Sequence, residues 1–149
     1  MSDLLLLNGP NLGTLGTRQP EVYGTTTLAE IEAEVRASVA AEGFGLRAEQ
    51  HDDEAGMLAA LRRHAGTVGA VVNPGAFMMA GWSLRDALAD YRSPWVEVHI
   101  SNVYARESFR HVSVLSPLAT GVIVGLGTAG YALAATALIR HVRAANGDR

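Results

Sequence analysis

The fold is decided by Leu4-Leu5-Leu6-Leu7, which is followed at once by Asn8-Gly9-Pro10-Asn11. A short, continuous apolar run bounded by turn residues is typical of a strand buried on both faces, and such strands occur in parallel sheets covered by helices. We therefore predict a first strand over residues 4–7 and a long polar loop from its end to Gly24.

Short apolar runs alternate with helical patterns along the rest of the chain. Predicted strands span 4–7, 44–50, 68–72, 95–100 and 121–126, and predicted helices span 28–42, 54–65, 83–91 and 131–143. The first helix is preceded by Thr27 and carries Glu30 three residues later, which is a capping box, and Gly43 ends it. This alternation predicts an α/β fold with a five-stranded parallel sheet and helices on both faces.

Length and charge limit the classes of protein to consider. A chain of 149 residues, 48% of them hydrophobic, matches one domain that spans residues 1–149. Twelve basic and fifteen acidic residues give a net charge of -3, so no basic field is available to hold a phosphate backbone. We expect no nucleic-acid partner.

The chain has no cysteine, and all twelve basic residues are arginine. The lack of cysteine excludes disulfides and zinc–thiolate sites and is compatible with a reducing cytoplasm, where we expect the protein to reside. The lack of lysine disfavours Schiff-base chemistry, pyridoxal enzymes and P-loop nucleotide hydrolases, because each of these needs a lysine amine.

Two stretches bear on membranes. The N-terminal residues 1–4 lack the positive charge of a secretory signal, and the apolar run after them is too short for one. Residues 112–139 contain no Asp, Glu, Lys or Arg, which raises a transmembrane alternative. Pro117 and four glycines interrupt this stretch, so a buried strand, a turn and an alanine-rich helix explain it better, and we expect no membrane partner.

Polar residues gather after three of the predicted strands, in the loops 8–23, 73–81 and 101–110. In an open parallel sheet, ligands bind beyond the carboxyl ends of the strands, where loops from neighbouring strands meet. The sequence therefore predicts that these three loops form one site.

Two nucleotide-binding alternatives arise from glycine-rich segments. Residues 125–130 match the GxGxxG pattern, but a dinucleotide site needs a further strand and an acidic residue beyond it, and only Asp148 follows. These glycines fit close packing of the last strand against the last helix. The loop 8–17 resembles a phosphate cradle for FMN, but Pro10 has no N–H to donate and no helix begins directly after the loop.

Arg18 and Tyr23 lie five residues apart in the first loop. The ordinary pKa of a tyrosine is about 10, and a guanidinium held beside the phenol lowers it. Tyr23 is therefore a candidate base. The alternative is that Arg18 is an ordinary surface residue and Tyr23 a packed ring.

Glu97, His99 and Ser101 share one face of the fourth predicted strand, because side chains alternate along a strand. Glu97 can orient the imidazole and stabilise its protonated form, which makes His99 a candidate proton donor. Metal ligation is the alternative, but two ligands without a third are a weak site, so we expect no metal. The other histidines, at positions 51, 64, 111 and 141, are interpreted as isolated surface or structural residues.

Four segments taken together carry a resemblance to a known family. They are Asn8-Gly9-Pro10-Asn11-Leu12 with the residues on to Gly24, Asn73-Pro74-Gly75-Ala76, Glu97-Val98-His99-Ile100-Ser101-Asn102, and the stretch from Arg106 to Gly127. In this order they resemble the type II 3-dehydroquinate dehydratases across essentially the whole chain. The resemblance implies a flavodoxin-like fold, no cofactor or metal, and a homododecamer built from trimers.

The resemblance also implies an activity, the anti elimination of water from 3-dehydroquinate through an enolate, in the shikimate pathway or in quinate catabolism. It implies a catalytic role for Tyr23 as base, Arg18 as the cation that lowers its pKa, Asn11 as holder of a water at the enolate oxygen, and His99 as acid oriented by Glu97. It implies substrate binding by Asn73, Ile100, Ser101 and Arg110, and by Asp86, which would reach a neighbouring subunit's site.

The sequence departs from the family at Met79, which stands where the family has a substrate-binding histidine. Methionine cannot donate that hydrogen bond, and such a loss costs about 1 to 3 kcal/mol. Two alternatives follow. The chain could dehydrate a related, more apolar cyclic β-hydroxyketone beside a wall of Met78, Met79 and Trp82, or it could be a catalytically silent homologue that binds a ligand.

Overall fold

The computed structural model describes residues 2–147, and Asp148 lies outside this range. Five strands form one parallel sheet: β1 (Asp3–Asn8), β2 (Gly45–Gln50), β3 (Gly69–Asn73), β4 (Trp95–His99) and β5 (Gly121–Val124). Their order in the sheet is β2-β1-β3-β4-β5. This order is that of flavodoxin-like folds and places β1 and β3 side by side at the reversal of strand order, so the predicted fold is confirmed.

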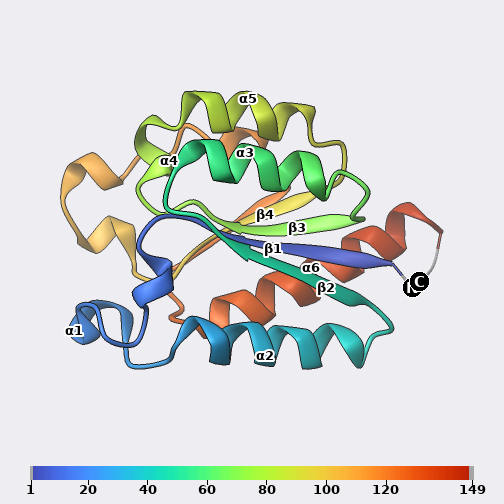
Figure 1. Ribbon diagram of the computed structural model, residues 1–149, viewed down its shortest axis with the longest axis horizontal. Helices are drawn as coiled ribbons and strands as arrows, with labels where there is room; N and C mark the ends of the chain where they lie inside the picture. Colours follow the sequence, from blue (N-terminus) through green and yellow to red (C-terminus); the bar gives the residue numbers. More distant parts are fainter. Residues whose placement is uncertain (1, 148–149) are drawn as a thin grey trace.

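Helices cover both faces of the sheet (Figure 1). Helices α2 (Leu28–Ala40) and α6 (Ala129–Ala145) pack on one face, and α3 (Glu54–Arg63) and α5 (Trp82–Asp90) pack on the other. The leucine run of β1 supplies apolar side chains to both faces of the sheet. Leu4 and Leu6 belong to the core under α2 and α6, whereas Leu5 and Leu7 belong to the core under α3 and α5. Each of the four is at most 1% exposed, as expected of a strand buried on both faces.

All five predicted strands and all four predicted helices are present, with ends shifted by a few residues. Thr27 caps α2 as predicted, because its side chain accepts a hydrogen bond from the Glu30 N–H at 3.2 Å. Strand β5 ends earlier than predicted. Gly125 adopts φ 85°, which ends the extended backbone at Val124. The close packing there also requires glycine, because a Cβ on Gly125 would lie 2.9 Å from the Asn102 Cβ.

The GxGxxG segment fits a packing role at its last glycine. A Cβ on Gly130 would lie 3.3 Å from Ile123 of β5 and 3.6 Å from Val98 of β4, so α6 begins in close contact with the sheet. Within residues 2–147, no helix is both long enough and apolar enough to cross a membrane.

The structure contains short helical turns that the sequence did not predict. They are α1 (Pro20–Tyr23), α4 (Phe77–Ala80) and four 3-10 turns, namely η1 (Leu12–Thr14), η2 (Val103–Ala105), η3 (Ser108–Arg110) and η4 (Ser116–Leu118). Turns of three or four residues leave no periodic apolar pattern to detect. They matter here because all of them except η4 lie in the three loops that were predicted to form the site.

The interpretation of His51 and His64 as isolated residues is wrong. The ring of His51 bonds Glu49 Oε1 at 2.8 Å, His64 bonds the other oxygen of Glu49, and the Arg63 guanidinium donates to both. The hydrogen bond from Arg63, assisted by the two histidines, lowers the pKa of Glu49 from 4.5 to about 2 against the opposing effect of burial. This cluster ties β2 to the end of α3.

Candidate active site

A small cavity of about 140 Å³ lies beyond the carboxyl ends of β1, β3 and β4, where the sequence predicted a site. Eight of the predicted site residues line it: Asn11, Arg18, Tyr23, Asn73, His99, Ile100, Ser101 and Arg110. They come from all three predicted loops. The topology of the sheet therefore brings together side chains that are far apart along the chain.

Gly9 allows the loops after β1 and β3 to meet. A Cβ at this position would lie 2.7 Å from the carbonyl oxygen of Pro74, which is closer than real Cβ contacts come. The Gly9 N–H instead donates a hydrogen bond to the Asn73 carbonyl at 2.8 Å. This contact fixes the distance between the loop that carries Asn11 and the loop that forms the opposite wall.

Two arginines surround the phenol of Tyr23. Arg106 Nη1 donates to the Tyr23 hydroxyl at 3.1 Å, and the guanidinium carbons of Arg18 and Arg106 lie 5.3 and 5.6 Å from the ring centroid. Partial burial acts to raise the pKa of Tyr23, but the hydrogen bonds and positive charges of Arg106 and Arg18 outweigh it, and the pKa is lowered. The phenol is thus suited to act as a base.

Arg106 also lines the cavity, although the sequence did not single it out. It bonds both Tyr23 and the Ser101 hydroxyl, each at 3.1 Å, and so links the first loop to the loop after β4. Arg106 and Tyr23 are 83 positions apart. Its presence in a loop that follows a strand carrying Glu97 and His99 was the available signal.

Glu97 and His99 form the predicted pair. His99 Nε2 and Glu97 Oε2 are 2.5 Å apart, and the Glu97 side chain is fully buried. The other oxygen of Glu97 accepts hydrogen bonds from the Ser113 and Ser116 hydroxyls at 3.1 and 2.8 Å. Because both oxygens of the carboxylate are bonded, Glu97 is held in one orientation and orients the imidazole in turn.

Asn73 takes part in a buried hydrogen-bonded chain. Its side-chain oxygen accepts from the Gly75 N–H at 3.1 Å, and its amide nitrogen donates to the Tyr131 hydroxyl at 2.8 Å. Tyr131 in turn donates to Asn8 Oδ1 at 2.6 Å. Asn8 and Asn73 occupy the same register position at the ends of β1 and β3. One amide hydrogen of Asn73, which lines the cavity, is left for a ligand.

Two predicted substrate-binding residues, Met79 and Asp86, are not part of the cavity lining. Helix α4 turns Met78 inward, where it is 5% exposed and lines the cavity, but the neighbouring Met79 does not line it. Trp82, expected beside them, is 62% exposed and likewise outside the lining. Of the three residues expected to form an apolar wall, Met78 alone lines this cavity.

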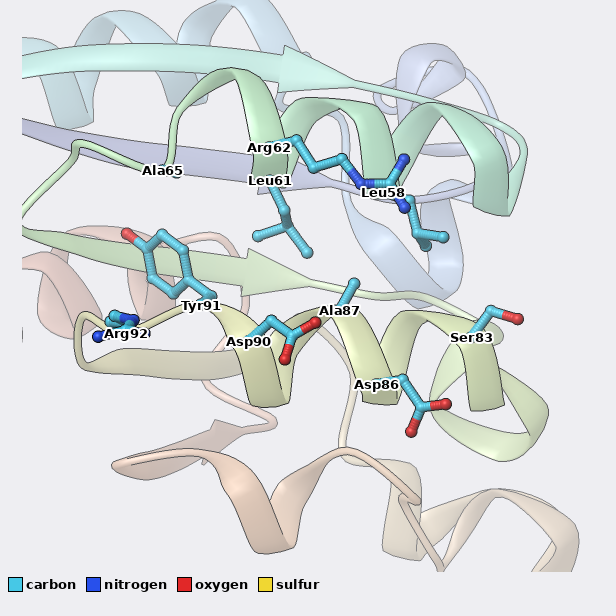
Figure 2. Close-up of a pocket in the computed structure, with 10 residues that line it drawn as sticks. All are labelled: Leu58, Leu61, Arg62, Ala65, Ser83, Asp86, Ala87, Asp90, Tyr91 and Arg92. Atoms are coloured by element: carbon cyan, nitrogen blue, oxygen red, sulfur yellow. The ribbon is translucent and has the colours of Figure 1, made fainter.

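Asp86 lies elsewhere, on α5. Figure 2 shows it beside a second cavity, of about 440 Å³, between α3 and α5. Leu58, Leu61 and Tyr91 supply apolar surface to this cavity. Asp86 can take part in catalysis only at a site other than the cavity of its own chain. Within the described residues, no three His, Cys, Asp or Glu side chains gather in a way that could hold a metal ion.

The fold and the site define a flavodoxin-like α/β protein that places a phenol of lowered pKa and a carboxylate-bound imidazole around one small cavity. A family model described as dehydroquinase class II matches residues 2–139. The chain belongs to the class II dehydroquinase family.

Named relatives and a solved structure of the same family are similar to this chain over most of its length. A 3-dehydroquinate dehydratase of Azorhizobium caulinodans is 49% identical over 139 residues, which are 93% of this chain and 95% of the relative. A catabolic 3-dehydroquinase of Pyricularia oryzae is 44% identical over 95% of this chain and 92% of its own length. The crystal structure of the type II dehydroquinase from Propionibacterium acnes superposes with a TM-score of 0.89 at 42% identity, covering 94% of this chain and 97% of that one.

The two arginines beside Tyr23 predict how its pKa should change when one of them is removed. Replacing Arg106 by methionine should raise the pKa of Tyr23, because one cationic hydrogen-bond donor is lost while burial still opposes ionisation. The ultraviolet absorbance of tyrosinate, followed against pH, measures this pKa. Subtracting the titration of a Tyr23→Phe variant removes the signal of the other tyrosines. Burial raises the pKa of Tyr91 and Tyr131, so these phenols ionise at higher pH.

The matched control for this titration is Arg140→Met, which removes an exposed arginine of α6. It should leave the titration of Tyr23 as in the parent protein. An Arg106→Met variant that titrates like the parent would show that Arg106 does not stabilise the phenolate.

Proposed function

We propose that the protein is a 3-dehydroquinate dehydratase, a hydro-lyase that removes water from 3-dehydroquinate and forms 3-dehydroshikimate through an enolate. The observation that carries the proposal is the phenol of Tyr23, whose pKa two arginines lower beside the same cavity that His99 lines. The names of the relatives support the choice of substrate.

Tyr23 is the base in this proposal. Its phenolate removes the proton next to the ketone, and Arg18 and Arg106 stabilise the phenolate at neutral pH. Negative charge then moves from the phenolate to the enolate oxygen. Asn11, which lines the cavity, holds a water molecule that donates a hydrogen bond to this oxygen.

His99 is the acid. It donates a proton to the hydroxyl group as the carbon–oxygen bond breaks, and this group leaves as water. The electron pair of the enolate then forms the carbon–carbon double bond and the ketone is restored. Glu97 holds the ring of His99 in one orientation, since the carboxylate oxygens of Glu97 are themselves fixed by hydrogen bonds to His99, Ser113 and Ser116. Elimination in two steps, with separate groups for the two proton transfers, fits this arrangement.

The remaining lining residues bind the substrate. The backbone N–H groups of Ile100 and Ser101, with the Ser101 hydroxyl, receive the carboxylate, and Asn73 and Arg110 bind ring hydroxyls. Met78 forms the wall beside them. We assign no substrate contact to Met79, and the elimination needs none from it, because the base and the acid come from other loops.

The account of the base predicts the effect of Tyr23→Phe. Turnover of 3-dehydroquinate should fall by about 10²–10⁴-fold, because no proton acceptor replaces the phenolate. The rise in ultraviolet absorbance of the conjugated enone product measures turnover. Tyr104→Phe, a change at a 62% exposed tyrosine, is the matched control and should keep the parent rate. Undiminished turnover in Tyr23→Phe would exclude Tyr23 as the base.

The position of Met79 predicts the effect of Met79→His. Since Met79 does not line the cavity, kcat/KM for 3-dehydroquinate should change by less than about 3-fold. The same absorbance assay measures it. A gain well beyond this range would show that residue 79 reaches the substrate and that the parent chain is tuned away from 3-dehydroquinate.

We also propose that residues 1–149 form one domain and that the chain assembles in the cytoplasm as a homododecamer of four trimers, with Asp86 reaching the site of a neighbouring subunit. Asp86 is exposed on α5 and does not line the candidate active site of its own chain, which supports this placement. Gel filtration should return a mass about twelve-fold that of the 15.7 kDa chain. A monomeric mass would remove both the assembly and the role of Asp86.

A further inference from the structure

Asn11 has an unusual backbone conformation. Its φ of 67° and ψ of -2° lie in the left-handed region, which non-glycine residues adopt rarely and at a cost in energy. Asn11 also precedes the 3-10 turn η1, and its carbonyl accepts hydrogen bonds from the N–H and the hydroxyl of Thr14. A residue held in this region needs surrounding contacts that stabilise it there.

The contact that holds the Asn11 backbone comes from Asp52, which is remote in sequence. The Asn11 N–H donates to Asp52 Oδ1 at 2.9 Å across 41 positions. The acceptor is a carboxylate, so the bond is charge-assisted and stronger than one to a neutral oxygen. The same bond lowers the pKa of Asp52, so the carboxylate remains ionised at neutral pH.

Asp52 is itself held by the sheet. Gln50, the last residue of β2, donates from Nε2 to Asp52 Oδ1 at 2.9 Å and to the Gly9 carbonyl at 3.0 Å. Gln50 pairs in register with Asn8, the last residue of β1. The carboxylate is thus tied to two paired strand ends, and its bond to Asn11 transfers that fixed position to the loop.

The two sides of Asn11 have different surroundings. Its side chain lines the cavity, whereas its N–H faces Asp52 on a part of the surface where water can compete for the bond. Without the carboxylate, water would satisfy the N–H in many loop conformations, and the left-handed conformation would lose its specific support. A small displacement of a group that acts on the transition state costs much rate.

We propose that Asp52 is a positioning residue, which fixes the Asn11 backbone so that the Asn11 side chain faces the reacting oxygen. The inference rests on the proposed function, in which Asn11 holds the water at the enolate oxygen. Asp52 does not line the cavity. Its effect must therefore pass through Asn11, and this dependence can be measured.

The test compares kcat and KM of Asp52→Ala, Asp52→Asn and Asn11→Ala, and of Asp52→Ala combined with Asn11→Ala. Asp52→Ala should lower kcat about 10-fold while KM changes by less than about 3-fold, because the contact acts on the transition state. Asp52→Asn should restore most of kcat, since an amide oxygen can accept the same two hydrogen bonds. In the Asn11→Ala background, Asp52→Ala should have no further effect on kcat.

A second measurement does not need turnover. Hydrogen exchange at the Asn11 amide, followed by nuclear magnetic resonance, should be slow in the parent protein and in Asp52→Asn but fast in Asp52→Ala. The matched control is Asp3→Ala, which removes a carboxylate bonded to Arg47 at the opposite end of the β1–β2 pair. It should change neither the exchange at Asn11 nor kcat.

Three results would overturn the inference: a parent-like kcat in Asp52→Ala, an equal loss in Asp52→Asn, or a loss that persists undiminished when Asn11 is already alanine. Unchanged exchange at the Asn11 amide in Asp52→Ala would also overturn it. A parent protein that does not turn over 3-dehydroquinate would instead overturn the proposed function, and with it the role of Asp52 in the reaction. The exchange experiment separates these cases, because it reports on the contact alone.

Discussion

The close approach of the loops after β1 and β3 is the constraint on which the site depends. Residue 9 must be glycine there, since a Cβ would lie 2.7 Å from the Pro74 carbonyl oxygen. The approach aligns the ends of the two strands, where Tyr131 joins Asn8 to Asn73 in a buried hydrogen-bonded chain. This junction, together with the hydrogen bond from the Gly9 N–H to the Asn73 carbonyl, positions the loop that carries Tyr23 and the loop that forms the facing wall.

Side chains of opposite charge hold the proposed base and the proposed acid. Two guanidiniums lower the pKa of the Tyr23 phenol, while a buried carboxylate holds the ring of His99 through a hydrogen bond. The hydrogen bonds of the two groups run outward into the scaffold, from Arg106 to Ser101 and from Glu97 to Ser113. A side chain held by such a second layer of contacts keeps its geometry without help from the ligand, which is how preorganised sites lower a barrier.

Local patterns in the sequence were sufficient to predict the sheet and the pairing of Glu97 with His99. The leucine run predicted a strand buried on both faces, and alternation along β4 placed Glu97 and His99 together. Contacts between distant segments were not predictable in this way. Arg106 meets Tyr23 across 83 positions, and the short turn α4 decides that Met78 faces the cavity while its neighbour does not. Such short turns and long-range pairs depend on tertiary packing, which leaves no periodic trace in the sequence.

The proposed reaction is an elimination of water from 3-dehydroquinate in this cavity, with the phenolate of Tyr23 as base. The most direct measurement is kcat/KM of the purified protein for 3-dehydroquinate as a function of pH, followed by the absorbance of the enone. With Tyr23 as base, turnover should rise with pH through a pKa below the ordinary tyrosine value of 10. No turnover at any pH, or a rise only at the ordinary value, would contradict it.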